Sequence, residues 1–195
     1  MRLDGEYKDL PVIYFEDGND LASWLKKHHQ ESTGIWAKFY KKNSGVPSLN
    51  WLEAVPILLR FGWIDSQAKG LDEVSYLQKF GPRKKNSLWS KINRDLAEEM
   101  IKNKTLTPAG IAAIELAKEN GNWDRAYAGP SSIEMPDDFK KALAANQKAK
   151  GFFESLNRTN SYAFLFRIVT AKKTETREKR INTFIGMLEK GEKFH

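Results

Sequence analysis

Residues 61–80 read FGWIDSQAKGLDEVSYLQKF, and they decide which fold class we expect. The segments 61–69 and 76–80 are rich in aromatic and branched side chains, which is typical of β-strands. Gly70 lies between them and predicts a turn.

Two further strands are predicted upstream of this pair. Residues 10–15 (LPVIYF) form a short apolar run, and residues 34–41 (GIWAKFYK) alternate and are rich in aromatics. Between them, Asn19 or Asp20 caps a helix that runs to about His29, because apolar residues recur there at helical spacing. The four segments together predict a small antiparallel sheet of three to four strands.

Helices are expected in most of the remaining chain. Asn50 and Glu53 form a capping-box pattern for a helix that reaches Arg60. Ser87 is the expected N-cap of the next helix, and Thr107 caps another that ends near Asn120. The residues of these two helices that are expected to face the core are Trp89, Ile92, Leu96, Met100, Ile111 and Ile114.

The segment 128–135 (AGPSSIEM) has no apolar periodicity and predicts a linker. Three helices are expected after it, beginning at Pro136, at Ser161 and after Thr174. The predicted fold class is therefore α+β and mainly helical, with a small antiparallel sheet covered by helices and a C-terminal helical subdomain. We expect an N-terminal part over 1–127, and a C-terminal part over 136–191 that packs as one unit.

The composition excludes several kinds of chemistry. The chain has no cysteine, and its three histidines (His28, His29 and His195) do not have metal-ligand spacing. We therefore expect no metal and no cofactor. No apolar run is long enough to span a membrane and no export signal is recognisable, so a cytoplasmic location is expected. The formal net charge of +7 favours anionic partners, either a small molecule or nucleic acid, although solubility alone also explains such a charge.

Residues 82–94 (PRKKNSLWSKINR) contain five cations and no acid. They precede a helix whose unpaired N–H groups and positive dipole end already attract anions. The pattern predicts an anion site in which Arg83 and Lys91 supply charge, Trp89 supplies apolar surface and Asn93 orients the ligand. A solvated basic turn is the alternative interpretation.

A second basic segment, residues 167–180 (RIVTAKKTETREKR), holds six cations and two glutamates. Arg177 and Arg180 lie three positions apart on one helix face, where they can grip phosphate or carboxylate oxygens, and Lys172 precedes them. The alternative is a surface helix with internal ion pairs.

Trp63 and Asp65 point to the same face of their predicted strand. An indole beside a carboxylate can line a pocket, and Asp65 is the weak candidate for a catalytic acid or base, with Arg83 stabilising developing negative charge. An aspartate that caps a helix or forms an ion pair is the alternative.

An ordered series of motifs resembles the YdeI/OmpD-associated family, also described as bacteriocin-protection proteins. In chain order the motifs are KK (41–42), EAV (53–55), FGWID (61–65), FGPR (80–83), S-x-W-S-x-x-N (87–93), TPAG (107–110), G-x-W-x-x-AY (121–127), AK (171–172) and TR with a following Arg (176–180). The resemblance implies a link to bacterial tolerance of antimicrobial peptides, bacteriocins and envelope stress, and it implies no agreed catalytic mechanism. Leu58-Leu59-Arg60 stands where the family commonly has Ala-Leu-Cys.

Three hypotheses follow. The first is a non-enzymatic binding protein that holds an anionic ligand, a phosphorylated metabolite or nucleic acid, between the sheet and the C-terminal helices. The second is an enzyme that uses Asp65, and the third is an interaction module whose C-terminal helices dock a partner protein. The oligomeric state stays open. The candidate ligand-binding residues are Trp63, Asp65, Arg83, Trp89, Lys91, Asn93, Lys172, Arg177 and Arg180.

Overall fold

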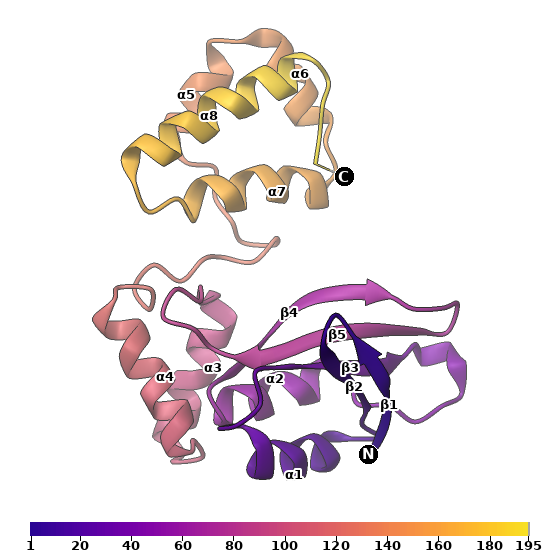
Figure 1. Cartoon of the computed structure of the whole chain (residues 1–195). Helices are drawn as coiled ribbons and strands as arrows, with labels where there is room; N and C mark the ends of the chain where they lie inside the picture. The colour runs from indigo at the N-terminus through magenta and orange to yellow at the C-terminus, as the bar shows by residue number, and fades with distance from the viewer. Residues whose placement is uncertain (195) are drawn as a thin grey trace. The chain divides into compact units, whose positions relative to one another are not determined.

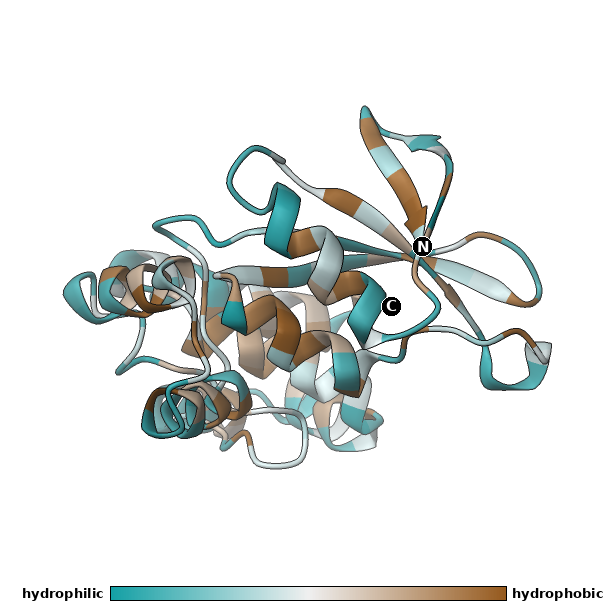
Figure 2. Ribbon diagram, turned by 90° about the horizontal axis from the view of Figure 1, so that it is seen from below, coloured by the Kyte–Doolittle hydropathy of each residue, from teal (hydrophilic) through white to brown (hydrophobic). Residues whose placement is uncertain are grey.

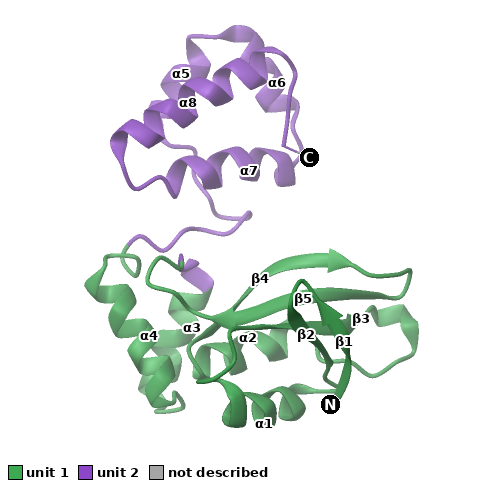
Figure 3. Ribbon diagram, in the orientation of Figure 1, with its two compact units in different colours: residues 1–87, 93–124 green, residues 88–92, 125–195 purple. Residues whose placement is uncertain are grey.

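The computed structural model describes residues 1–194, so that His195 lies outside the described residues. The chain divides into two compact units (Figure 3). The sheet unit comprises Met1–Ser87 and Asn93–Asp124, and the helical unit comprises Leu88–Ile92 and the residues from Arg125 on. Each unit has its own hydrophobic core.

The sheet unit contains a five-stranded mixed sheet with the strand order β1-β2-β3-β5-β4 (Figure 1). Strands β2 and β3 run parallel, whereas the pairs β1–β2, β3–β5 and β4–β5 are antiparallel. The strands are β1 (Arg2–Tyr7), β2 (Leu10–Tyr14), β3 (Ile35–Tyr40), β4 (Trp63–Gly70) and β5 (Ser75–Pro82).

The predicted antiparallel sheet of three to four strands is therefore wrong in strand number and in direction. Strand β1 (RLDGEY) is mostly polar and lies at the edge of the sheet, so it carries no apolar signal. Strands β2 and β3 are separated by helix α1 (Gly18–His28), which carries the chain back to the starting end of the sheet. A helical crossover of this kind produces parallel pairing.

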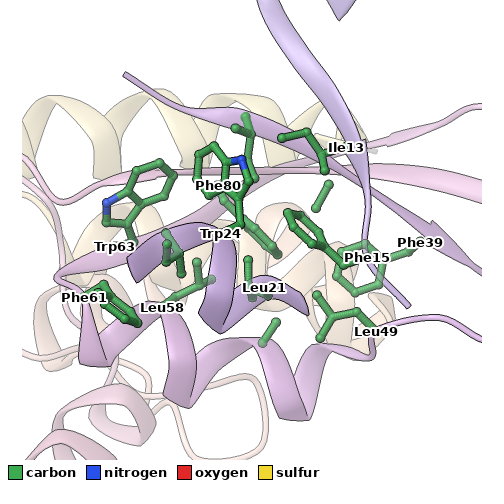
Figure 4. Close-up of a cluster of buried hydrophobic side chains, with 14 residues drawn as sticks. Ile13, Phe15, Leu21, Trp24, Phe39, Leu49, Leu58, Phe61, Trp63 and Phe80 are labelled. Carbon is green, nitrogen blue, oxygen red and sulfur yellow. The ribbon is translucent and has the colours of Figure 1, made fainter. Parts of the chain in front are cut away.

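Helices α1 and α2 (Trp51–Arg60) lie on one face of the sheet (Figure 1). The predicted capping box of α2 is confirmed, since the Asn50 side chain accepts from the Glu53 N–H and Glu53 accepts from the Asn50 N–H. Fourteen buried residues fill the space between these helices and the sheet, among them Phe15, Trp24 and Trp63 (Figure 4).

Helices α3 (Lys91–Lys102) and α4 (Pro108–Glu119) follow the sheet. Helix α3 begins at Lys91 rather than directly after Ser87, because the Ser87 hydroxyl accepts from the Lys84 N–H and closes a turn before the helix. As a result, Ile92 is 61% exposed and does not belong to a core stripe.

The helical unit has four main helices rather than the expected three. They are α5 (Asp137–Ala144), α6 (Gln147–Ser155), α7 (Arg158–Val169) and α8 (Thr174–Glu189). Asn146 caps α6 with its side chain and so separates it from α5, whereas Gly151, the expected break, lies inside α6. The hydropathy colours of Figure 2 alternate along the helical ribbons, as expected of helices that bury one face.

Candidate binding site

The structure brings four of the candidate residues together in the sheet unit. Trp63, Asp65, Arg83 and Asn93 line one hollow, together with apolar residues of α2. The hollow holds about 140 Å³ of space between atoms, none of it wide enough for a water molecule. The cluster exists, but it leaves no room for a ligand.

Trp63 belongs to the core of the sheet unit. Its side chain is 1% exposed, and its ring packs edge-on against Trp24 with the centroids 5.7 Å apart (Figure 4). Its indole N–H donates to the backbone carbonyl of His29 at 3.2 Å. The ring therefore stabilises the packing of α1 on the sheet.

Asp65 lines this hollow and also bonds to Trp51, a residue that lines a second and larger pocket. Its carboxylate accepts a hydrogen bond of 3.1 Å from the indole N–H of Trp51, the first residue of α2. The side chain of Asp65 thereby fixes the orientation of the Trp51 ring.

We name this second cavity the aromatic pocket. It has a volume of about 500 Å³ and lies where the end of β3, the loop after it, the start of α2 and strand β5 meet. The residues that line it are Phe39, Tyr40, Lys41, Lys42, Val46, Ser48, Leu49, Asn50, Trp51 and Tyr76. The lining contains four aromatic rings and two lysines, and no carboxylate.

The aromatic walls of the pocket are held by their neighbours. Tyr76 stacks on Phe39 with centroids 5.2 Å apart and planes 20° from parallel, and burial raises the pKa of Tyr76. Tyr40 packs edge-on against Tyr14, whose hydroxyl donates to the carbonyl of Pro47 at 2.6 Å. These contacts fix the rings before any ligand enters.

The two lysines differ in their freedom. The Lys41 ammonium donates to the carbonyl of Glu73 at 2.9 Å. Lys42 is exposed, and within residues 1–194 its side chain forms no ion pair and no hydrogen bond. Lys42 is thus the cation of the pocket that can meet an incoming anion without breaking an existing contact.

Trp51 was not among the sequence-predicted candidates. Helical spacing puts it on the same stripe as Val55 and Leu58, so the pattern alone assigns it to the core. In the structure its side chain is 43% exposed, whereas Val55 and Leu58 are buried. The KK motif at 41–42, which the sequence pattern marked only through the family resemblance, also lies in this pocket.

The candidate residues of the helical unit have structural partners of their own. Arg177 donates from Nε and Nη2 to the two carboxylate oxygens of Asp138, at 2.5 and 2.9 Å, and from Nη1 to the carbonyl of Ile168 at 3.0 Å. Arg180 donates to the carbonyl of Arg167 at 2.5 Å. Both arginines therefore hold the C-terminal end of α7 against α8.

The remaining candidates of this unit lie elsewhere. Lys172 is exposed in the turn before α8. Lys91 lines a cavity of about 320 Å³ with Arg125 and Tyr127, among others. Trp89 accepts the Tyr127 N–H at its backbone carbonyl, at 2.9 Å. Ligand contacts by these residues, and a site formed jointly with the sheet, stay predictions.

Within residues 1–194, no group of three or more histidine, aspartate or glutamate side chains is arranged to hold a metal ion. Among the same residues, no helix combines the length and the hydropathy that crossing a membrane requires.

Two segments of the chain match family models, one in the N-terminal and one in the C-terminal part. No curated protein and no solved structure matches the chain. The family model described as Bacteriocin-protection, YdeI or OmpD-Associated matches residues 132–191, which confirms the family that the motifs resemble. The model described as Domain of unknown function (DUF8412) matches residues 13–113, more than half of the 195 residues. The chain therefore belongs to the family of that domain, and it carries a YdeI or OmpD-associated segment in its C-terminal part.

Proposed function

We propose that the protein is a binding protein for an anionic small molecule that contains a planar ring, and that the aromatic pocket is its site. The observation that carries this proposal is the Trp51 indole, which is 43% exposed at the pocket wall and fixed by Asp65 at 3.1 Å. A ring that is already fixed loses little conformational freedom when a ligand stacks on it. Lys41 and Lys42 supply the complementary charge.

The size and lining of the pocket support a phosphorylated metabolite as the ligand. Small-molecule sites commonly enclose about 300–1,000 Å³ and combine aromatic walls with a few polar groups. The aromatic pocket, at about 500 Å³ and with two lysines, fits this description. The proposal includes a cytoplasmic location and a role in tolerance of bacteriocins, antimicrobial peptides or envelope stress, in keeping with the description of the family matched at residues 132–191.

The geometry favours binding over the two alternatives. An enzyme with Asp65 as acid or base needs a substrate next to that carboxylate, yet the carboxylate is used by Trp51 and the hollow beside Arg83 has no room for water. A docking role for the C-terminal helices needs exposed apolar surface. Between residues 137 and 189, no large hydrophobic side chain is exposed.

The proposal is tested with adenosine monophosphate, adenosine and ribose 5-phosphate as three matched probes. We expect the monophosphate to bind most tightly, because it alone offers both a ring for Trp51 and a charge for Lys42. Binding is measured by isothermal titration calorimetry at low salt, together with the rise in melting temperature.

The matched variants are Trp51→Ala and Leu52→Ala. Loss of a stacking partner costs about 1–3 kcal/mol, so Trp51→Ala should weaken binding by roughly fivefold to a hundredfold. Leu52 is 77% exposed and does not line the pocket, and its variant should bind like the parent protein. Equal affinity for the monophosphate and for ribose 5-phosphate, or unchanged binding by Trp51→Ala, would show that the pocket is not the site.

A further inference from the structure

A third cavity of the sheet unit has no part in the proposal above. It lies along α3 and α4 and has a volume of about 300 Å³. Its apolar lining consists of Met100, Ile101, Leu106, Ile111 and Ile114, and its polar lining consists of Lys104, Glu115 and Lys118. We name this cavity the α3–α4 groove.

The groove exposes apolar side chains that the sequence pattern assigned to the interior. Ile111 was expected to face inward with Ile114, but Ile111 is 44% exposed and only Ile114 is buried, at 3%. Ile101, on the opposite helix, is 43% exposed. Apolar surface left in water is unfavourable, and an apolar hollow with a charged rim is a common feature of ligand grooves.

The charges of the groove favour an anion. Lys104 and Lys118 line it, against the single carboxylate of Glu115. The Lys118 ammonium lies 5.4 Å from the centroid of the Trp123 ring, and this contact leaves its positive charge in place. A ligand that carries one negative charge therefore complements the groove.

Lys104 occupies a backbone position at which glycine is the usual residue. It follows the end of α3 with a φ of 54°, its N–H bonds to the carbonyl of Ile101, and the Thr105 N–H bonds to the carbonyl of Met100. This bonding pattern closes a helix through a left-handed residue, and a side chain there is strained. The lysine thus keeps its ammonium at the groove at a cost in stability.

From the apolar lining and the excess of lysine we propose that the α3–α4 groove binds a single-chain amphiphile with an anionic head group. The alkyl chain would lie along Met100, Ile101 and Ile111, and the head group would meet Lys104 and Lys118. The small volume of the groove suits one chain rather than a phospholipid with two.

The test uses dodecanoate below its micelle concentration, with dodecyltrimethylammonium and acetate as probes of the head-group charge and of the chain. We expect calorimetry on the full chain to show binding of dodecanoate, at least fivefold weaker binding of the cationic amphiphile, and none of acetate. Equal binding of the two amphiphiles, or no binding of dodecanoate, overturns the proposal.

Three variants locate the site. Lys104→Gly should weaken dodecanoate binding at least fivefold while its melting temperature stays equal or rises, a combination that general destabilisation cannot produce. Ile111→Glu should abolish binding, whereas Ala112→Glu, an exposed neighbour outside the groove, should leave it unchanged. Normal dodecanoate binding by Ile111→Glu would show that the groove is not the binding site and would overturn the proposal.

Discussion

At the scale of single residues, the ion pair of Asp138 and Arg177 makes stability depend on pH. The hydrogen bonds from Arg177 hold the pKa of Asp138 below its ordinary value. An aspartate whose pKa is lower in the folded state stabilises the fold above its unfolded-state pKa of about 3.9. That contribution is lost as the pH falls through the folded-state pKa.

We therefore expect Asp138→Asn to lower the free energy of unfolding at pH 7 by up to about 1 kcal/mol, the upper range for a partly exposed pair. The difference from the parent protein should be smaller at about pH 3 than at pH 7, because the contribution of the carboxylate is lost as the pH falls below the unfolded-state pKa and through the lowered folded-state pKa of Asp138. Urea unfolding at the two pH values measures it, and Asp137→Asn, at the preceding position in the first turn of α5, is the control. A loss that is as large in acid as at neutrality would contradict this account.

At the scale of elements, two glycines let α2 and α4 approach closely. A Cβ atom on Gly110 would lie 2.5 Å from the carbonyl oxygen of Arg60, and one on Gly62 would lie 2.6 Å from that of Ala109. Thr107 donates to the same Arg60 carbonyl from its hydroxyl, at 2.7 Å, and from its N–H. The FGWID and TPAG motifs are thus the two sides of one contact, and this contact positions the start of β4.

We expect Gly110→Ala to destabilise the protein by about 2 kcal/mol or more, since the added methyl must push backbone aside. Gly186→Ala is the matched control, because Gly186 lies inside α8 with open space around its Cα. Alanine is favoured there over glycine by about 1 kcal/mol, so this variant should gain stability. Melting temperatures of both variants give the comparison, and equal effects of the two changes would refute the close-approach argument.

At the scale of the whole molecule, the net charge of +7 bears on which anion is bound. A monophosphate in the aromatic pocket exchanges few counterions, so its affinity should fall only about threefold to tenfold between 50 and 200 mM salt. A nucleic acid that contacts many phosphates loses roughly a thousandfold or more over that range. Parallel titrations with adenosine monophosphate and a single-stranded oligonucleotide distinguish the two. Tight binding of the oligonucleotide whose affinity falls steeply with salt concentration would show that nucleic acid, rather than a small molecule, is the ligand.

The candidate site was predictable only in part. Strand alternation correctly placed Trp63 and Asp65 on one face, and with Arg83 and Asn93 they meet at one hollow. The sequence does not reveal that the hollow is closed, because its size depends on how α2 packs on the sheet. Nor does it reveal that Trp51 projects beyond the core, since helical spacing puts Trp51 on the buried stripe of α2.

The sequence by itself determined the elements whose signals are local: the capped starts of α2 and α4, the strand at 34–41 and the order of the family motifs. Capping and periodicity act within a few residues, so the chain carries them without any partner. The tertiary structure alone decided the parallel pairing of β2 with β3, the recruitment of the polar strand β1, and the two cavities beside α2 and α4. These features depend on contacts between segments far apart in sequence, and such contacts form only when burial of the shared core brings the segments together.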